Sequence, residues 1–156
     1  MPKSLEQGSS AVAFSLDTDG GGKVTLKDFV GKPLVLYFYP KDDTSGCTKE
    51  ALDFTAKAAA FKKLGATVVG ISKDSVAAHD KFKKKHKLSV ILASDPEGKI
   101  INAYGSWVEK SMYGRKYMGI ERSTFLVDSK GKIARIWRKV RVPGHVEEVL
   151  DAIHAL

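Results

Sequence analysis

The sequence has almost no cysteine and no long apolar run, and both absences exclude classes of protein. Cys47 is the only cysteine among 156 residues, so no disulfide can form within the chain, as expected in a reducing compartment. A disulfide reductase with a Cys-x-x-Cys pair is excluded, because Thr44 occupies the first of those positions. No apolar run approaches the roughly 18 residues of a membrane-spanning helix, and residues 1–7 lack the apolar core of a signal peptide. We therefore expect a cytoplasmic protein with no membrane partner.

Acidic residues are too few to balance the basic ones. There are 26 lysines and arginines against 18 aspartates and glutamates, which gives a net charge of +8. Much of the excess falls in two groups, Lys81, Lys83, Lys84, Lys85 and Lys87 in one and Arg135, Arg138, Lys139 and Arg141 in the other. We interpret both groups as solvated faces and expect no specific nucleic-acid partner, because no recognised binding motif accompanies the charge. Length and composition are ordinary for a globular protein, and we expect residues 1–156 to form a single domain.

The glycine-rich stretch at residues 17–22 predicts a turn rather than a ligand-binding loop. It separates two short apolar pieces, residues 12–14 and 23–26, which together indicate an N-terminal β-hairpin. A phosphate-binding loop would need Ser or Thr after Lys23, and a calcium loop would need a ligand at Gly21 and flanking helices. The stretch lacks all of these features, so we expect neither a cofactor nor a metal there.

The rest of the chain alternates between buried strands and helices. Strands are predicted at residues 34–39, 66–71, 90–93, 123–127 and 132–137, and helices at residues 48–64, 76–86, 95–104 and 146–153, with a long loop before residue 123. This order predicts an α/β fold with a central mixed β-sheet and helices on both faces. His79 and His86 lie on the second helix with no cysteine or clustered carboxylate beside them, so we expect partly exposed side chains rather than metal ligands.

Cys47 lies where a buried strand gives way to a helix. Thr44 or Ser45 is suited to cap that helix, so the sulfur falls in its first turn. There the unpaired backbone N–H groups and the positive end of the helix dipole favour the thiolate over the thiol. This position predicts a nucleophilic cysteine, whereas the alternative is a small buried hydrophobic residue without chemistry.

Two blocks of sequence resemble the peroxiredoxins, which are thiol peroxidases. Pro40-x-x-x-Thr44-x-x-Cys47 is similar to their active-site signature, and residues 105–128 are similar to the peroxiredoxin Q subgroup, also called bacterioferritin comigratory protein. The resemblance implies a thioredoxin-like fold and a monomer. It also implies reduction of hydrogen peroxide and small organic hydroperoxides through a Cys47 sulfenic acid.

The same resemblance implies roles for four residues around Cys47. Thr44 would offer a hydroxyl, Arg122 a guanidinium that pairs with thiolate and peroxide, and Pro40 a cover that excludes water from the pocket. Glu50, one turn after Cys47, would orient Arg122 or merely complement the helix dipole. Without the resemblance, Thr44 is only a cap, Pro40 a strand terminator and Arg122 a surface residue.

The chain departs from the subgroup at Ser45, where proline is frequent, and at Leu52, where many members carry a resolving cysteine. The alternative location of that cysteine, the helix predicted from Ser75 to His86, has none either. The resemblance therefore implies a one-cysteine enzyme that an external thiol regenerates, either thioredoxin or glutaredoxin with glutathione. The alternative from a different class is a basic binding or chaperone-like protein with a vestigial thiol.

Overall fold

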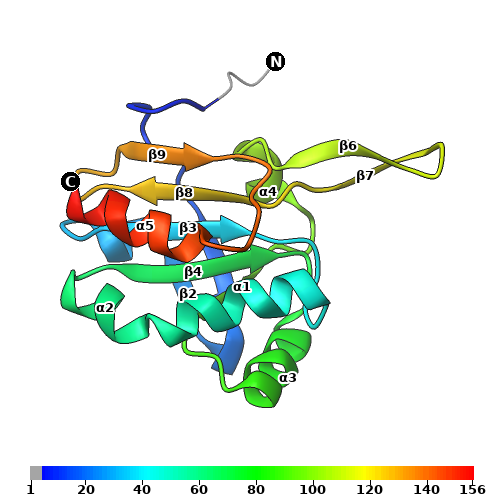
Figure 1. Ribbon diagram of the computed structural model, residues 1–156, viewed down its shortest axis with the longest axis horizontal. Coiled ribbons are helices and arrows are strands. Elements are labelled where there is room, and N and C mark those ends of the chain that lie inside the picture. The colour runs from blue at the N-terminus through cyan, green and yellow to red at the C-terminus, as the bar shows by residue number, and fades with distance from the viewer. Residues whose placement is uncertain (1–4) are drawn as a thin grey trace.

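The structure is a computed structural model that describes residues 5–156 (Figure 1). Its strands are β1 (Ser15–Thr18), β2 (Lys23–Thr25), β3 (Leu34–Phe38), β4 (Thr67–Ser72), β5 (Ile91–Ser94), β6 (Trp107–Met112), β7 (Arg115–Ile120), β8 (Ser123–Val127) and β9 (Ile133–Trp137). The α-helices are α1 (Ser45–Ala56), α2 (Ala58–Lys63), α3 (Val76–His86), α4 (Lys99–Ala103) and α5 (His145–His154), and two 3-10 turns cover Asp19–Gly21 and Leu26–Phe29.

Seven strands form one mixed sheet in the order β2-β1-β5-β4-β3-β8-β9, while β6 and β7 form a separate two-stranded sheet. β3 lies inside the large sheet, parallel to β4 and antiparallel to β8. All five of its side chains are buried, because both faces of the sheet are covered. This arrangement confirms the predicted mixed sheet and explains the continuous apolar run at residues 34–39.

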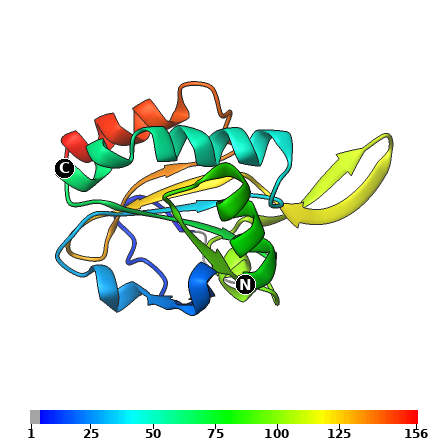
Figure 2. The ribbon, with the colours of Figure 1, turned by 90° about the horizontal axis from the view of Figure 1, so that it is seen from below.

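Alternate residues of β3 belong to two separate cores. Val35 and Tyr37 pack in one core with side chains from α1, α2, α3 and α5, and Figure 2 shows α1, α2 and α5 together on that side of the sheet. Leu34, Leu36 and Phe38 pack in the other core with α4 and the N-terminal strands. The sheet therefore holds the end of β3, and with it the loop to Cys47, between two packed layers.

The N-terminal hairpin is confirmed, but its first strand begins later than predicted. β1 starts at Ser15 and pairs Leu16 with Val24 of β2, whereas residues 12–14 were expected to form that strand. The carbonyl of Val12 instead accepts a hydrogen bond from the Tyr104 hydroxyl at 2.7 Å. The Asp19 carboxylate in the turn accepts from the Leu92 backbone N–H at 2.8 Å, so the glycine-rich stretch is anchored to β5.

Residues 48–64, predicted as one helix, form α1 and α2 with a break at Lys57. The backbone of Lys57 has φ −103° and ψ 13°, and its N–H bonds to the carbonyl of Phe54. The break lets Phe61 pack against Phe54, with their ring centroids 5.7 Å apart. The sequence has no Gly or Pro at this break. We therefore attribute the break to tertiary packing rather than to local helix propensity.

Two further predictions between residues 95 and 122 are wrong. The helix expected to start at Asp95 begins at Lys99, because the Asp95 carboxylate accepts from the Ile101 N–H at 2.8 Å and Gly98 adopts a φ of 72°. The segment expected to be a long loop is the β6–β7 hairpin. Its strands are mostly exposed, and their apolar residues do not alternate with polar ones, so they lack the pattern that marks a half-buried strand.

Candidate active site

The Cys47 sulfur lies in the first turn of α1, as predicted. Thr44 is the N-cap residue, and Cys47 is the third residue of the helix. Its side chain is only 1% exposed, since β3 and α1 bring it into the same core as Tyr37 and Tyr39. Burial excludes bulk water from the thiol, so the groups that touch the sulfur decide its chemistry.

Arg122 is the side chain that reaches the sulfur. Its Nη2 donates to Cys47 Sγ at 3.3 Å, and its Nη1 donates to Glu50 Oε1 at 2.7 Å. The residue lies between β7 and β8, where its carbonyl accepts from the Val140 N–H at 2.9 Å. The structure therefore brings together Cys47, Glu50 and Arg122, which are separated by up to 75 positions in the sequence.

Gly46 is a site residue that sequence reasoning missed. A Cβ atom at this position would lie 3.1 Å from Arg122 Nη2, which is closer than side-chain atoms normally approach. The bare backbone of Gly46 therefore leaves room for the guanidinium to cross the helix start. A glycine in a helix is usually unfavourable, and this cost was the available signal.

Glu50 is completely buried, and its ionisation responds to that burial. Burial raises the pKa of Glu50 to about 7, although the charge and hydrogen bond of Arg122 act in the opposite direction. Within residues 5–156, Glu50 Oε2 has no hydrogen-bond partner. Burial alone would lower the pKa of Arg122, but the charges of Glu50 and Cys47 raise it overall, so the guanidinium stays protonated.

Thr44 occupies the predicted cap position, but its hydroxyl makes a different bond. Thr44 Oγ1 donates to the carbonyl of Lys41 at 2.8 Å, and no side-chain cap bond forms within the described helix start. A hydroxyl has one proton and two lone pairs, so this bond leaves the oxygen free to accept. Pro40 directly follows the buried Tyr39 and is itself exposed.

His79 is fully buried, so the prediction of a partly exposed side chain is wrong. Its Nδ1 lies 2.7 Å from Asp42 Oδ2 and its Nε2 lies 3.0 Å from the carbonyl of Ala93. The Tyr39 hydroxyl donates to the other oxygen of Asp42 at 2.6 Å. This network ties the loop between Pro40 and Thr44 to α3, and its long sequence separations hid it from the sequence analysis.

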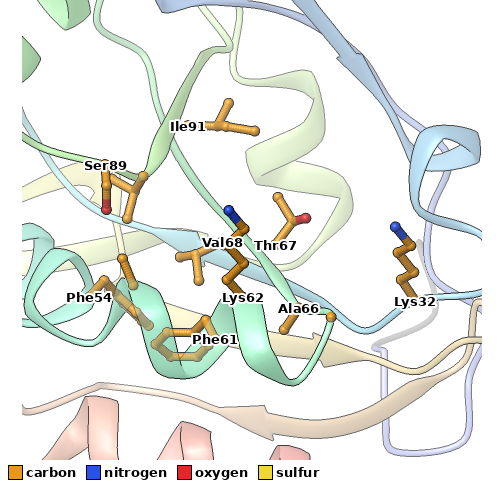
Figure 3. Close-up of a pocket in the computed structure, with 12 residues that line it drawn as sticks. Lys32, Phe54, Phe61, Lys62, Ala66, Thr67, Val68, Ser89 and Ile91 are labelled. Carbon is orange, nitrogen blue, oxygen red and sulfur yellow. The ribbon is translucent and has the colours of Figure 1, made fainter.

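A cavity of about 390 Å³ has a lining that does not include Cys47, and Figure 3 shows the residues that line it. Phe54, Phe61 and Val68 contribute to its apolar lining, and Lys32 and Lys62 contribute ammonium groups. Phe54 lies two helical turns after Cys47, so the cavity is at the far end of α1 from the sulfur. It does not contribute to the Cys47 site.

The described part of the chain, residues 5–156, contains no cluster of three or more His, Cys, Asp or Glu side chains that could hold a metal ion. No helix within the same residues is long and apolar enough to cross a membrane.

The fold and the Cys47 site together define the class of protein. Cys47 is buried at a strand-to-helix junction of a mixed sheet flanked by helices, and it is paired with Arg122. This is the arrangement of a thiol peroxidase.

Comparison with known proteins gives the family. The AhpC/TSA family model matches residues 7–136. A putative peroxiredoxin bcp of Coxiella burnetii is 50% identical over 96% of this chain and 99% of that protein, and peroxiredoxin Bcp of Bacillus subtilis is 47% identical over 96% and 95%. The chain therefore belongs to the AhpC/TSA family, and its relatives are peroxiredoxins of the Bcp or peroxiredoxin Q subgroup.

Solved structures agree with this assignment. A peroxiredoxin Q of Xylella fastidiosa superposes with a TM-score of 0.93 at 39% identity, covering 98% of each chain. A peroxiredoxin Q of Xanthomonas campestris gives a TM-score of 0.87 at 46% identity, covering 91% of this chain and 90% of that one. The predicted thioredoxin-like fold is confirmed, and so is the prediction of a peroxiredoxin with a single cysteine.

Proposed function

We propose that Cys47 attacks a hydroperoxide as a thiolate and that Arg122, Thr44 and Pro40 form the rest of the reaction site. The observation that carries the proposal is the contact of 3.3 Å between Arg122 Nη2 and Cys47 Sγ. The substrates are hydrogen peroxide and small organic hydroperoxides. Trapped intermediate and ligand complex structures of the Xanthomonas campestris bacterioferritin comigratory protein are described as giving insight into its alkyl peroxide reduction activity, which supports this substrate class.

The reaction moves negative charge from sulfur to oxygen. The thiolate forms an S–O bond to one peroxide oxygen while the O–O bond breaks, and the leaving oxygen takes a proton to depart as water or an alcohol. The guanidinium of Arg122 stabilises the thiolate before the attack and the leaving oxygen during it. The Thr44 hydroxyl donates its hydrogen bond to the Lys41 carbonyl. Its oxygen therefore accepts a hydrogen bond from the substrate O–H.

An external thiol must then reduce the sulfenic acid, because the chain has no second cysteine. We propose thioredoxin, or glutaredoxin with glutathione, as that thiol and the cytoplasm as the location. We also propose that the enzyme acts as a monomer of one domain. An assay that compares thioredoxin, glutaredoxin with glutathione, and dithiothreitol as electron donors tests the reductant.

Substitution of the site residues tests the proposed chemistry. Cys47→Ser should abolish peroxide consumption, and Arg122→Ala should slow it on the order of 100-fold, as the loss of a transition-state charge donor does. Stoichiometric peroxide should convert Cys47 to a sulfenic acid that a dimedone-type reagent traps. Oxidised methionines beside an unmodified Cys47, or a native chain that consumes peroxide no faster than Cys47→Ser does, would instead support a basic binding protein with a vestigial thiol.

A further inference from the structure

The β6–β7 hairpin has a surface that the peroxidase site does not explain. It projects from the body of the molecule, and its base lies beside the loop that leads into α1 (Figures 1 and 2). Four large apolar side chains near its end are exposed: Met112 (56%), Tyr113 (98%), Tyr117 (44%) and Met118 (51%). Most of the exposed large apolar side chains in residues 5–156 therefore gather on this one arm.

Tyr113 occupies a backbone position that does not suit it. Tyr113 and Gly114 form the two-residue turn between the paired residues Met112 and Arg115, with φ of 52° and 78°. Turns with two positive φ values favour Asn or Asp followed by Gly, and a bulky residue at positive φ is uncommon. The arm therefore carries an aromatic ring at its tip at a conformational cost, although the ring makes almost no contact within the chain.

Both faces of the arm carry apolar and basic side chains near the tip, although the Lys116 ammonium lies 3.8 Å from the Glu109 carboxylate on one of them. Strand alternation places Met118 and Lys116 on one face, and Met112, Tyr117 and Arg115 on the other. A protein partner that docks on a sheet face covers one side, whereas immersion in a layer of lipid headgroups surrounds both sides and the tip. Tyrosine and basic side chains are enriched at membrane–water interfaces, where one end of a side chain is apolar and the other wet.

We propose that the end of the β6–β7 hairpin docks on a membrane surface that contains anionic lipid. Tyr113, Met112 and Met118 enter the headgroup layer, while Arg115 and Lys116 contact lipid phosphates. The net charge of +8 supports attraction to an anionic surface. The expectation of no membrane partner came from the lack of a spanning segment, but attachment to the surface needs only a few amphipathic side chains.

The base of the arm connects this surface to the thiol. Lys110 lies in β6, on the same face as Tyr117, and its aliphatic chain covers Gly119. Burial and then the charge of Arg122 lower the pKa of Lys110, as expected for a side chain near the Cys47 site. Docking of the tip would hold Cys47 close to hydroperoxides formed in the bilayer, a consequence that rests on the proposed function.

Vesicle binding tests the proposal without any peroxide, so it is independent of the peroxidase activity. The full chain should bind vesicles of phosphatidylcholine with about 30% phosphatidylglycerol at least tenfold more tightly than pure phosphatidylcholine, and added salt should weaken the binding. The double variant Tyr113→Ser with Met118→Ser should bind about tenfold more weakly, and so should Arg115→Glu with Lys116→Glu. Both should reduce hydrogen peroxide in solution at the native rate.

Matched controls lie elsewhere on the surface. Val30 is 71% exposed, and Lys84 lies on the outer side of α3, so Val30→Ser and Lys84→Glu change the same kinds of surface away from the hairpin. Brominated lipid should quench the tryptophan fluorescence of a Tyr113→Trp variant more strongly than that of the native chain, whose tryptophans are Trp107 and Trp137.

Three results would overturn the proposal. The first is no binding of the native chain to anionic vesicles at low salt. The second is equal loss of binding in the Val30 and Lys84 controls. The third is a photocrosslinker at residue 113 that captures thioredoxin, and not lipid, when vesicles and thioredoxin are both present, since the arm would then be a protein-docking surface.

Discussion

Gly46 determines how closely Arg122 approaches the thiol. Its missing side chain leaves the space through which the guanidinium reaches Cys47, since an added Cβ would meet Arg122 Nη2 at 3.1 Å. Alanine favours a helix over glycine by about 1 kcal/mol. Stability and chemistry therefore place opposite demands on this position, as is common where an active site is built into a helix.

The Gly46→Ala variant should be more stable and less active. We expect its free energy of unfolding to rise by up to about 1 kcal/mol, and its peroxide reduction to slow about tenfold as the guanidinium shifts from the sulfur. Urea unfolding and steady-state kinetics measure the two effects, with Ser45→Ala as a control in the same turn. A variant with native activity would show that Arg122 adjusts without loss.

Glu50 and His145 should give the protein two opposed responses to pH. The folded state keeps the Glu50 carboxyl neutral up to about pH 7, against an ordinary pKa of 4.5, so the folded state holds the extra proton between these values and stability falls as pH rises through them. Burial lowers the pKa of His145 from 6.5 to about 4, so stability rises with pH over that range.

We therefore expect a Glu50→Gln variant to gain stability relative to the native chain as pH rises. Integration of the Glu50 shift from about pH 5 to about pH 8 gives a change on the order of 2 kcal/mol in the difference between the two proteins. The His145→Gln variant should show a difference of opposite sign. Urea unfolding at the two pH values measures both, and a difference that does not depend on pH would contradict the assigned protonation of Glu50.

The strands and helices that sequence predicted well are those with a strong local signal. β3 and β4 are apolar runs with flanking breakers, and α3 follows a Ser75 cap that accepts from the Ala78 N–H at 3.1 Å. The β6–β7 hairpin was missed because solvent covers both of its faces, so no apolar alternation marks it. At the site, Cys47, Arg122 and Glu50 were predicted together only through family resemblance. The His79 network was missed because its contacts join α3 to the loop after β3 and to β5, which are far apart in the sequence.

Helix α1 carries both Cys47 and Leu52, so its geometry decides whether a cysteine at position 52 could form a disulfide with Cys47. Leu52, the position at which the resemblance to the peroxiredoxin Q subgroup implies a resolving cysteine in many members, is 39% exposed and five residues after Cys47. Residues five apart on an ideal helix have Cα atoms about 8.6 Å apart, beyond the roughly 7 Å that a disulfide tolerates. A disulfide at these positions therefore requires the start of α1 to unwind.

A Leu52→Cys variant should form that disulfide after one equivalent of peroxide. We expect a measurable loss of helical circular dichroism and greater resistance to excess peroxide, because the disulfide removes the sulfenic acid before further oxidation. Peptide mapping under non-reducing conditions identifies the bond. A persistent Cys47 sulfenate beside an unreacted introduced thiol would mean that the helix start is too rigid to open.

At the scale of the whole molecule, burial of the thiol and the net charge both disfavour a disulfide between two copies of the chain. Cys47 is 1% exposed, so a second protein thiol reaches its sulfur only when the start of α1 opens. Each copy carries a net charge of +8, and like charges slow the approach of two such surfaces. The single sheet that joins β2 to β9 also supports our proposal that residues 1–156 act as one domain.

The chain should therefore remain a monomer of 17.0 kDa before and after oxidation. With excess peroxide and no reductant, Cys47 should pass through the sulfenic acid to the sulfinic acid, because no internal thiol intercepts it and an intermolecular disulfide forms slowly. Sedimentation equilibrium over a range of concentrations measures the mass, and mass spectrometry of the oxidised chain counts the added oxygens. The Leu52→Cys variant is the control, since its second thiol should suppress the sulfinic product. A disulfide-linked dimer that accumulates faster than the sulfinic acid would show that the start of α1 opens readily to a second copy.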